Sequence, residues 1–167
     1  IEVIFVGGNL YVADTYNNKI RKIVISTGVV TTFAGSTQGF QDGTGTSAKF
    51  YYPNGITTDG TNLYVGDTYN HRIRKIVIST GVVSTLAGSG SQGSADGTGT
   101  AGTFNKPQGV TSDGTNLYVA DQGNHNIRKI VISTGEVSTF AGKAGHYGST
   151  DATGTSARFS HPVGITT

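Results

Sequence analysis

The chain has 167 residues, of which 26 are glycine and 3 proline, and it contains no cysteine, methionine or tryptophan. Charged residues are 13% of the total and the formal net charge is only +2, which disfavours nucleic acid as a partner. A disulfide framework is excluded, and no apolar run approaches the roughly 18 residues of a membrane-spanning helix. A low-charge, Thr- and Gly-rich chain of this kind is typical of bacterial extracellular or cell-surface proteins.

Short β-branched runs separated by Gly, Asn, Asp and Ser predict strands along the whole chain. Residues 1–5, "IEVIF", stand where later units have a first strand, although the P-x-G sequence that precedes that strand is missing. The next unit shows all four expected strands, at residues 55–59, 63–67, 73–78 and 82–88, joined by turns such as "GTN" and "STG". The chain ends on "PVGITT", which predicts a terminal first strand at 163–167 with no second strand after it.

The sequence repeats itself three times. Asp14, Asp67 and Asp121 are 53 and 54 residues apart, and "NLYVADTYNNKIRKI" at residue 9 recurs as "NLYVGDTYNHRIRKI" and "NLYVADQGNHNIRKI". A period near 50 residues with four short strands per unit predicts the blades of a β-propeller. The third strand carries apolar residues on both faces, which suits a sheet packed between two neighbouring sheets.

The recurring "NLYVAD…N..IRKI…TG.V.T.AG", followed by "DGTGT.A.F..P.GI", resembles the NHL repeat in its long-blade bacterial form. The resemblance covers nearly the whole chain. It implies a propeller, usually of six blades, that binds proteins, glycans or RNA, while some relatives are lyases or lactonases.

We therefore predict a single all-β region over residues 1–167, an arc of three four-stranded antiparallel blades at about 1–35, 54–88 and 108–142. Because known propellers have about 4 to 8 blades, three blades leave two blade faces open. We expect the arc to be half of a six-bladed propeller, completed by a second copy in a homodimer or by further blades of a longer chain. Head-to-tail growth into a fibre or surface stalk is the alternative.

The loops that follow the second strands are expected to open on the same side as the long connectors between blades. Tyrosine, asparagine and histidine side chains there combine an apolar body with hydrogen-bonding groups, which suits a protein or glycan ligand. The predicted binding residues are Tyr16, Asn17, Tyr69, Asn70, His71, Asn124 and His125.

An acidic and a basic residue recur at fixed positions in every blade. They are Asp14, Asp67 and Asp121 at the ends of the second strands, and Arg21, Arg74 and Arg128 in the third strands. We predict structural roles for all six, in ion pairs or in turns. In the connectors, Asp42, Asp96 and Asp151 are expected to form Asx turns, with Phe50, Phe104 and Phe159 holding each loop to its blade.

The residue pattern favours a non-catalytic scaffold without cofactor or metal. His71 and His125 fall on different blades, and no H-x-H or H-x-x-x-H spacing includes them or His146 and His161. No Ser/His/Asp set is identifiable. The alternative is a lactonase- or lyase-like enzyme with its site in the central channel, but the innermost strands there, "GITTD" and "GVTSD", consist mostly of Thr and Ser.

Overall fold

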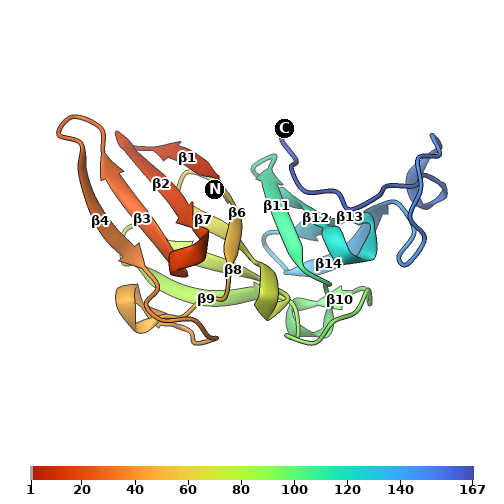
Figure 1. Ribbon diagram of the computed structural model, residues 1–167, viewed down its shortest axis with the longest axis horizontal. Helices are drawn as coiled ribbons and strands as arrows, with labels where there is room; N and C mark the ends of the chain where they lie inside the picture. Colours follow the sequence, from red (N-terminus) through yellow and green to blue (C-terminus); the bar gives the residue numbers. More distant parts are fainter. Residues whose placement is uncertain (1) are drawn as a thin grey trace.

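The computed structural model describes residues 2–167 and has the shape of an open arc of three antiparallel β-sheets (Figure 1). The first sheet contains β1 (Val3–Val6), β2 (Asn9–Asp14), β3 (Lys19–Val24) and β4 (Val29–Ala34) in that order. The second contains β6 (Pro53–Thr58), β7 (Asn62–Asp67), β8 (Arg72–Val77) and β9 (Val82–Ala87). The third contains β11 (Pro107–Ser112), β12 (Asn116–Asp121), β13 (Asn126–Val131) and β14 (Glu136–Ala141).

These sheets confirm the prediction of three four-stranded antiparallel blades. Two very short strands inside the connectors, β5 (Gly43–Thr44) and β10 (Gly97–Thr98), pair with the outer strands β9 and β14 and make the second and third sheets five-stranded. Short 3-10 turns follow: η2 (Gly45–Ser47), η4 (Gly99–Ala101) and, in the third connector, η6 (Gly154–Ser156). No helix within residues 2–167 is long and apolar enough to span a membrane.

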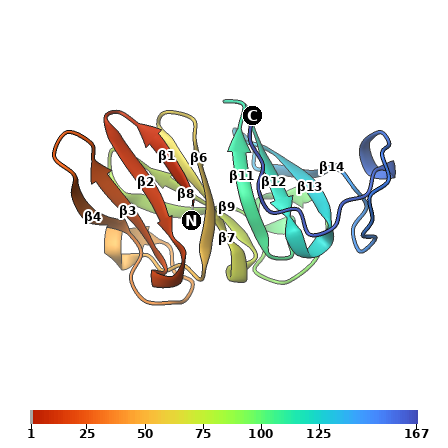
Figure 2. The ribbon, with the colours of Figure 1, turned by 45° about the horizontal axis from the view of Figure 1, so that its top comes forward.

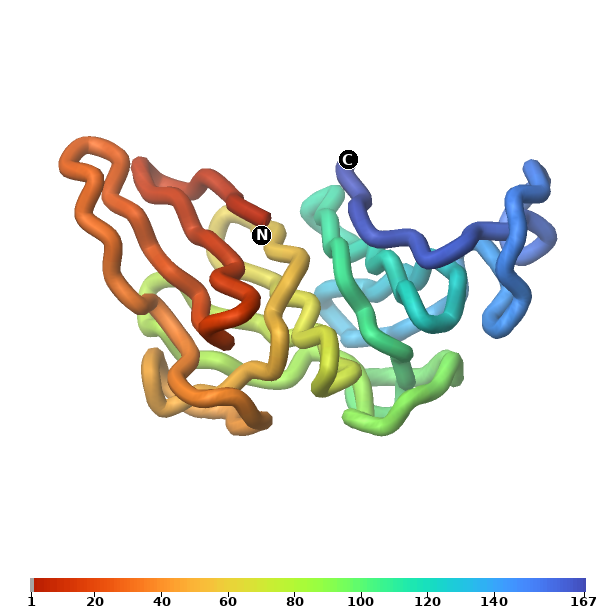
Figure 3. The backbone as a smooth tube through the Cα atoms, in the orientation of Figure 1, coloured from red at the N-terminus to blue at the C-terminus, as the bar shows by residue number. Residues whose placement is uncertain are grey.

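The innermost strands β1, β6 and β11 line the inner side of the arc (Figure 2). Residues 163–167 run along β11 and carry no strand, so the terminal first strand expected there is not formed. The tube in Figure 3 shows this last segment crossing from the third connector back to β11. The physical reason is that the first strand of a blade pairs with the second strand of the same blade, and in the described part of the chain no such strand lies beside these residues.

Two apolar layers join the blades. The layer between the first and second blades is built from both sheets and the connector: Tyr11, Ile20, Ala34, Phe50, Ile56, Leu63, Val65, Ile76 and Val83. The layer between the second and third blades uses equivalent positions: Tyr64, Ile73, Ala87, Phe104, Val110, Leu117, Val119, Ile130 and Val137. Phe50 and Phe104 are fully buried, as expected for residues that hold the connectors to the blades.

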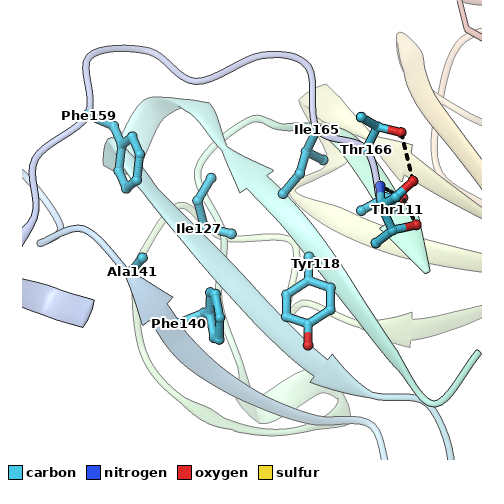
Figure 4. A pocket seen from close by; sticks show the side chains of 9 residues that line it. Thr111, Tyr118, Ile127, Phe140, Ala141, Phe159, Ile165 and Thr166 are labelled. Atoms are coloured by element: carbon cyan, nitrogen blue, oxygen red, sulfur yellow. Dashed lines mark hydrogen bonds between the residues drawn. The ribbon is translucent and has the colours of Figure 1, made fainter. Parts of the chain in front are cut away.

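Within residues 2–167, the two outer blade faces have no such cover. On the third blade, Tyr118, Ile127, Phe140 and Ala141 line a groove of about 320 Å³ together with Phe159 and the C-terminal segment (Figure 4). On the first blade, Val3, Phe5 and Val30 are 50%, 61% and 49% exposed. Most of these residues have counterparts in the second blade that are buried: Ile56 for Val3, Val83 for Val30, Tyr64 for Tyr118, Ile73 for Ile127 and Ala87 for Ala141.

Candidate functional site: the loop face

Four tyrosines meet on the loop face, at the junction between the first and second blades. The ring centroids are 5.1 Å apart for Tyr16 and Tyr52, 5.1 Å for Tyr52 and Tyr69, and 5.0 Å for Tyr51 and Tyr69. Tyr16 is 79% exposed and Tyr69 is 40% exposed. We call Tyr16, Tyr51, Tyr52 and Tyr69 the tyrosine cluster, and it presents contiguous aromatic surface to solvent.

Two kinds of local structure bring these tyrosines together. Tyr16 and Tyr69 lie in the 3-10 turns η1 (Thr15–Asn17) and η3 (Thr68–Asn70), directly after the second strands. Tyr51 and Tyr52 end the connector that enters β6, and Tyr52 has a left-handed backbone with φ of 62°. The N–H of Tyr51 donates to Asp67 Oδ1 at 2.8 Å, and that of Tyr52 donates to Asn18 Oδ1, also at 2.8 Å. Both bonds fix the connector against the blades and so fix the cluster.

The bond that the N–H of Tyr52 donates to Asn18 has a counterpart at each of the other two connectors. In the second blade the acceptor is His71 Nδ1, which receives the N–H of Lys106 at 3.1 Å. In the third it is His125 Nδ1, which receives the N–H of His161, again at 3.1 Å. We call these three bonds the connector clamps. Asn18, His71 and His125 all have left-handed backbones, with φ of 55°, 54° and 60°.

Neither the second junction nor the third connector reproduces the tyrosine cluster. Gly123 replaces tyrosine in η5 (Gln122–Asn124), and a Cβ there would lie 2.5 Å from Asn105 Cγ. Lys106 takes the place of Tyr52, with its Nζ 5.7 Å from the centroid of the Tyr69 ring. The third connector instead brings His125 near His161 and Tyr147, with ring centroids 4.3 Å and 5.7 Å away. The cluster is thus specific to the first junction, although the blades are nearly identical.

Buried ion pairs hold the floor of the loop face. Arg74 Nη1 donates to Asp67 Oδ2 at 2.8 Å and Arg74 Nη2 donates to Asp42 Oδ1 at 2.6 Å, and the Arg74 and Asp67 side chains are both fully buried. The third blade repeats the arrangement with Arg128, Asp121 and Asp96. Asp42 and Asp96 therefore serve as ion-pair partners, a role the Asx-turn expectation did not include.

The carboxylates in these pairs are in an unusual environment. Burial raises the pKa of Asp121 to about 6, while the N–H of Asn105, the Asn124 amide and Arg128 all oppose the shift. Burial also raises the pKa of Asp67, against the attraction of Arg74. At neutral pH we expect both carboxylates to be ionised, because every group that hydrogen-bonds them is a donor.

The predicted binding residues fall into two groups. Some present their side chains to solvent, and others already use their side chains in hydrogen bonds within the chain. The Asn70 amide donates to Asp67 Oδ2 and to the Gly39 carbonyl, and Asn124 does the same with Asp121 and Gly93. Three other predicted residues also make internal hydrogen bonds. The Asn17 amide donates to the Asp14 carboxylate, and Nδ1 of His71 and of His125 each accepts a backbone N–H. Tyr16 and Tyr69 present their rings to solvent.

Sequence reasoning did not single out Tyr51 and Tyr52. The available signal was "YYP" where the other connectors read "NKP" and "SHP", directly before the first strand of a blade. Comparing the copies for their differences would have found this pair, whereas comparing them for their likeness did not.

A second concave region lies at the inner side of the arc. It has a volume of about 230 Å³ and is lined by Glu2, Ile4, Ile56, Thr57, Val110, Thr111 and neighbouring residues. The Glu2 carboxylate accepts the N–H of Ile56 at 2.8 Å, and burial raises its pKa. Among residues 2–167 no three His, Cys, Asp or Glu side chains are grouped so that they could hold a metal ion.

A family model described as NHL repeat matches residues 50–76. NHL repeat-containing protein 2 of Bos taurus is 35% identical over 144 residues, which cover 78% of this chain and 20% of that protein. The chain thus spans about a fifth of the length of that relative.

Solved structures share the fold. A structural genomics protein of unknown function from Bacteroides thetaiotaomicron superposes with a TM-score of 0.76 at 25% identity, covering 96% of this chain and 39% of that one. An auxiliary nutrient binding protein from the same organism has a TM-score of 0.71 at 22% identity, covering 95% and 40%. With three in-register copies of the motif, three four-stranded blades and these matches, the chain belongs to the NHL-repeat family.

Proposed function

We propose that this chain is a non-catalytic NHL-repeat scaffold that binds a protein or glycan through the tyrosine cluster and assembles through its two open blade faces. The tyrosine cluster carries the first half of the proposal. Four rings joined by three ring contacts, with Tyr16 79% exposed, offer a large apolar area that also carries hydroxyl groups. Tyrosines are enriched at recognition surfaces because they lose little side-chain entropy on binding.

The binding proposal is tested by probing a glycan array and a peptide array with the labelled chain. For the glycans or peptides that bind the unmodified chain, we expect the affinity of the double variant Tyr16→Ala/Tyr69→Ala to be at least about tenfold lower. Interface tyrosines often contribute more than about 1 kcal/mol each to the free energy of binding. Tyr147→Ala is the matched control, because Tyr147 is 74% exposed in the third connector, away from the cluster. Equal binding by the chain and the double variant would contradict the proposal.

The second part of the proposal, assembly, is supported by the two open blade faces. Phe140 on the third blade is 53% exposed and Val30 on the first is 49% exposed, whereas Val83, the counterpart of Val30, is 1% exposed. Apolar patches of this kind mark interaction surfaces on soluble proteins. Further blades, from a second copy or from a longer chain, would cover both faces.

Light scattering of the 167-residue chain tests assembly. Two chains of 17.3 kDa give about 35 kDa for a closed pair of arcs, and a much larger, concentration-dependent mass would indicate a fibre. A mass near 17.3 kDa at all concentrations would contradict assembly. The enzyme alternative would place its site in the inner hollow, where Glu2 is the acidic residue and Thr57, Thr111 and Thr166 are the neighbouring polar ones.

A further inference from the structure

The last six residues repeat the first strand of a blade. They read "PVGITT", against "PNGITT" in β6 and "PQGVTS" in β11. The structure already places them where a fourth blade would begin: the N–H of Gly109 donates to the Val163 carbonyl at 2.8 Å, and that of Thr167 to Thr111 Oγ1 at 3.2 Å. Ile165 and Thr166 border the groove on the third blade, and the edge of this segment that faces away from β11 has no strand beside it in residues 2–167 (Figure 4).

By contrast, β1 is a poor copy of a first strand. Gly55 and Gly109 allow the innermost strands to approach closely: a Cβ on Gly55 would lie 2.3 Å from the Gln108 carbonyl oxygen, and one on Gly109 would lie 2.3 Å from that of Val163. The residue of the first blade equivalent to Gly55 is Glu2, directly before β1, and its carboxylate accepts the N–H of Ile56 instead. A hollow remains between β1 and its neighbours, and Val3 is 50% exposed where its counterpart Ile56 is 4% exposed.

We propose that residues 162–167 of one copy displace β1 of a second copy and pair with the inner edge of its β2. This inference rests on the proposed assembly through the open faces and adds how the seam is made. The register follows from the second blade, where Ile56, Thr57 and Thr58 face Val65, Tyr64 and Leu63. The exchanged pairs are then Ile165 with Val12, Thr166 with Tyr11, and Thr167 with Leu10.

The displacement is required by the position of the segment. A second copy that docks its first blade into the groove of the third blade brings its own β1 to the place that residues 163–167 occupy. One of the two strands has to leave, and "PVGITT" has the glycine that the close approach needs. Once seated, the second copy's Leu10, Val12, Ile23 and Val30 cover Tyr118, Ile127 and Phe140, as their counterparts do at both existing junctions.

The absence of cysteine allows the seam to be tested by engineered disulfides. In the variant Val12→Cys/Ile165→Cys, exchange predicts a disulfide between chains and a species of about 35 kDa on a non-reducing gel, because opposed residues in paired strands are close enough to bridge. The matched control is Val3→Cys/Val12→Cys, because Val3 and Val12 face each other within one chain. Its oxidised form ties β1 to β2, so we expect it to be monomeric, and to dimerise after reduction.

The outcomes separate the seam from the assembly. A dimer that persists in oxidised Val3→Cys/Val12→Cys, with no interchain disulfide in Val12→Cys/Ile165→Cys, would overturn strand exchange and leave the proposed assembly standing. A chain that is monomeric in every variant, and before any substitution, would overturn both.

Discussion

The first and second blades have almost the same sequence but differ in how deeply the same ion pair is buried. In the second blade the Asp67 and Arg74 side chains are both fully buried, whereas Asp14 and Arg21 in the first are 22% and 31% exposed. The difference comes from the connector that precedes the second blade, which supplies Asp42 and the N–H of Tyr51. The burial of this ion pair therefore depends on the connector that precedes the blade, as in repeat proteins whose units depend on their neighbours.

The strongest test of this comparison removes the acid from each pair. Asp67→Ala leaves the buried Arg74 without its one fully buried acidic partner, so we expect a loss of about 3–5 kcal/mol in the free energy of unfolding. Asp14→Ala removes a partly exposed pair and should lower the free energy of unfolding by less than that, about 1 kcal/mol. Urea denaturation at a fixed protein concentration measures both losses. Equal losses would show that the connector does not change the contribution of the ion pair to stability.

A second test compares apolar residues at the same position. Leu63 is fully buried in the junction between blades, and Leu63→Ala should cost about 2–4 kcal/mol. Leu10 is its half-buried counterpart on the open face, and Leu10→Ala should lower the free energy of unfolding of a monomer by about 1 kcal/mol. If a second copy covers Leu10, the loss in free energy of unfolding caused by Leu10→Ala rises with protein concentration. The concentration dependence of this loss then measures assembly.

The smallest expected effect concerns the connector clamps. Protonated His71 cannot accept the N–H of Lys106, and burial, followed by the charges of Lys106 and Arg72, lowers the pKa of His71 from 6.5. A lowered folded-state pKa means that the unfolded chain binds the proton more readily, so stability falls as the pH drops below about 6.5.

Replacing His71 by the asparagine that the first blade has at this position should remove that pH dependence. We expect His71→Asn to match the unmodified chain at pH 7.5 and to be more stable by about 1 kcal/mol or less at pH 5.5. Denaturation curves at the two pH values decide it. A pH profile unchanged by the substitution would show that the His71 clamp does not respond to protonation.

The blades and the open faces could be predicted from the sequence because they depend on short-range patterns. A strand such as Asn62–Asp67 and its turn are encoded within a few residues, and repetition at 53 and 54 residues identifies the unit. The contacts of Asp42 could not be predicted in this way, since its partner Arg74 lies 32 residues further on, across an irregular connector.

For the same reason, the grouping of the four tyrosines into one cluster could not be predicted. Tyr16 and Tyr52 are 36 residues apart, and only the path of the connector brings their rings to 5.1 Å. Similarly, Asn70 and Asn124, predicted to bind a ligand, turn inward, because Asp67 and Asp121 accept hydrogen bonds from their amides. The folded connectors, more than the strands, decide which side chains of the loop face are accessible.

The equivalence of the two apolar layers has a consequence for the evolution of the chain's length. Both layers are made by the same positions, so excising one period of 54 residues, from Pro53 to Lys106, would join the first blade to the third. The new neighbours would meet through residues that differ little from those they lost. The products of an unequal exchange between internal copies would therefore keep the packing of each pair of blades while the number of blades varies.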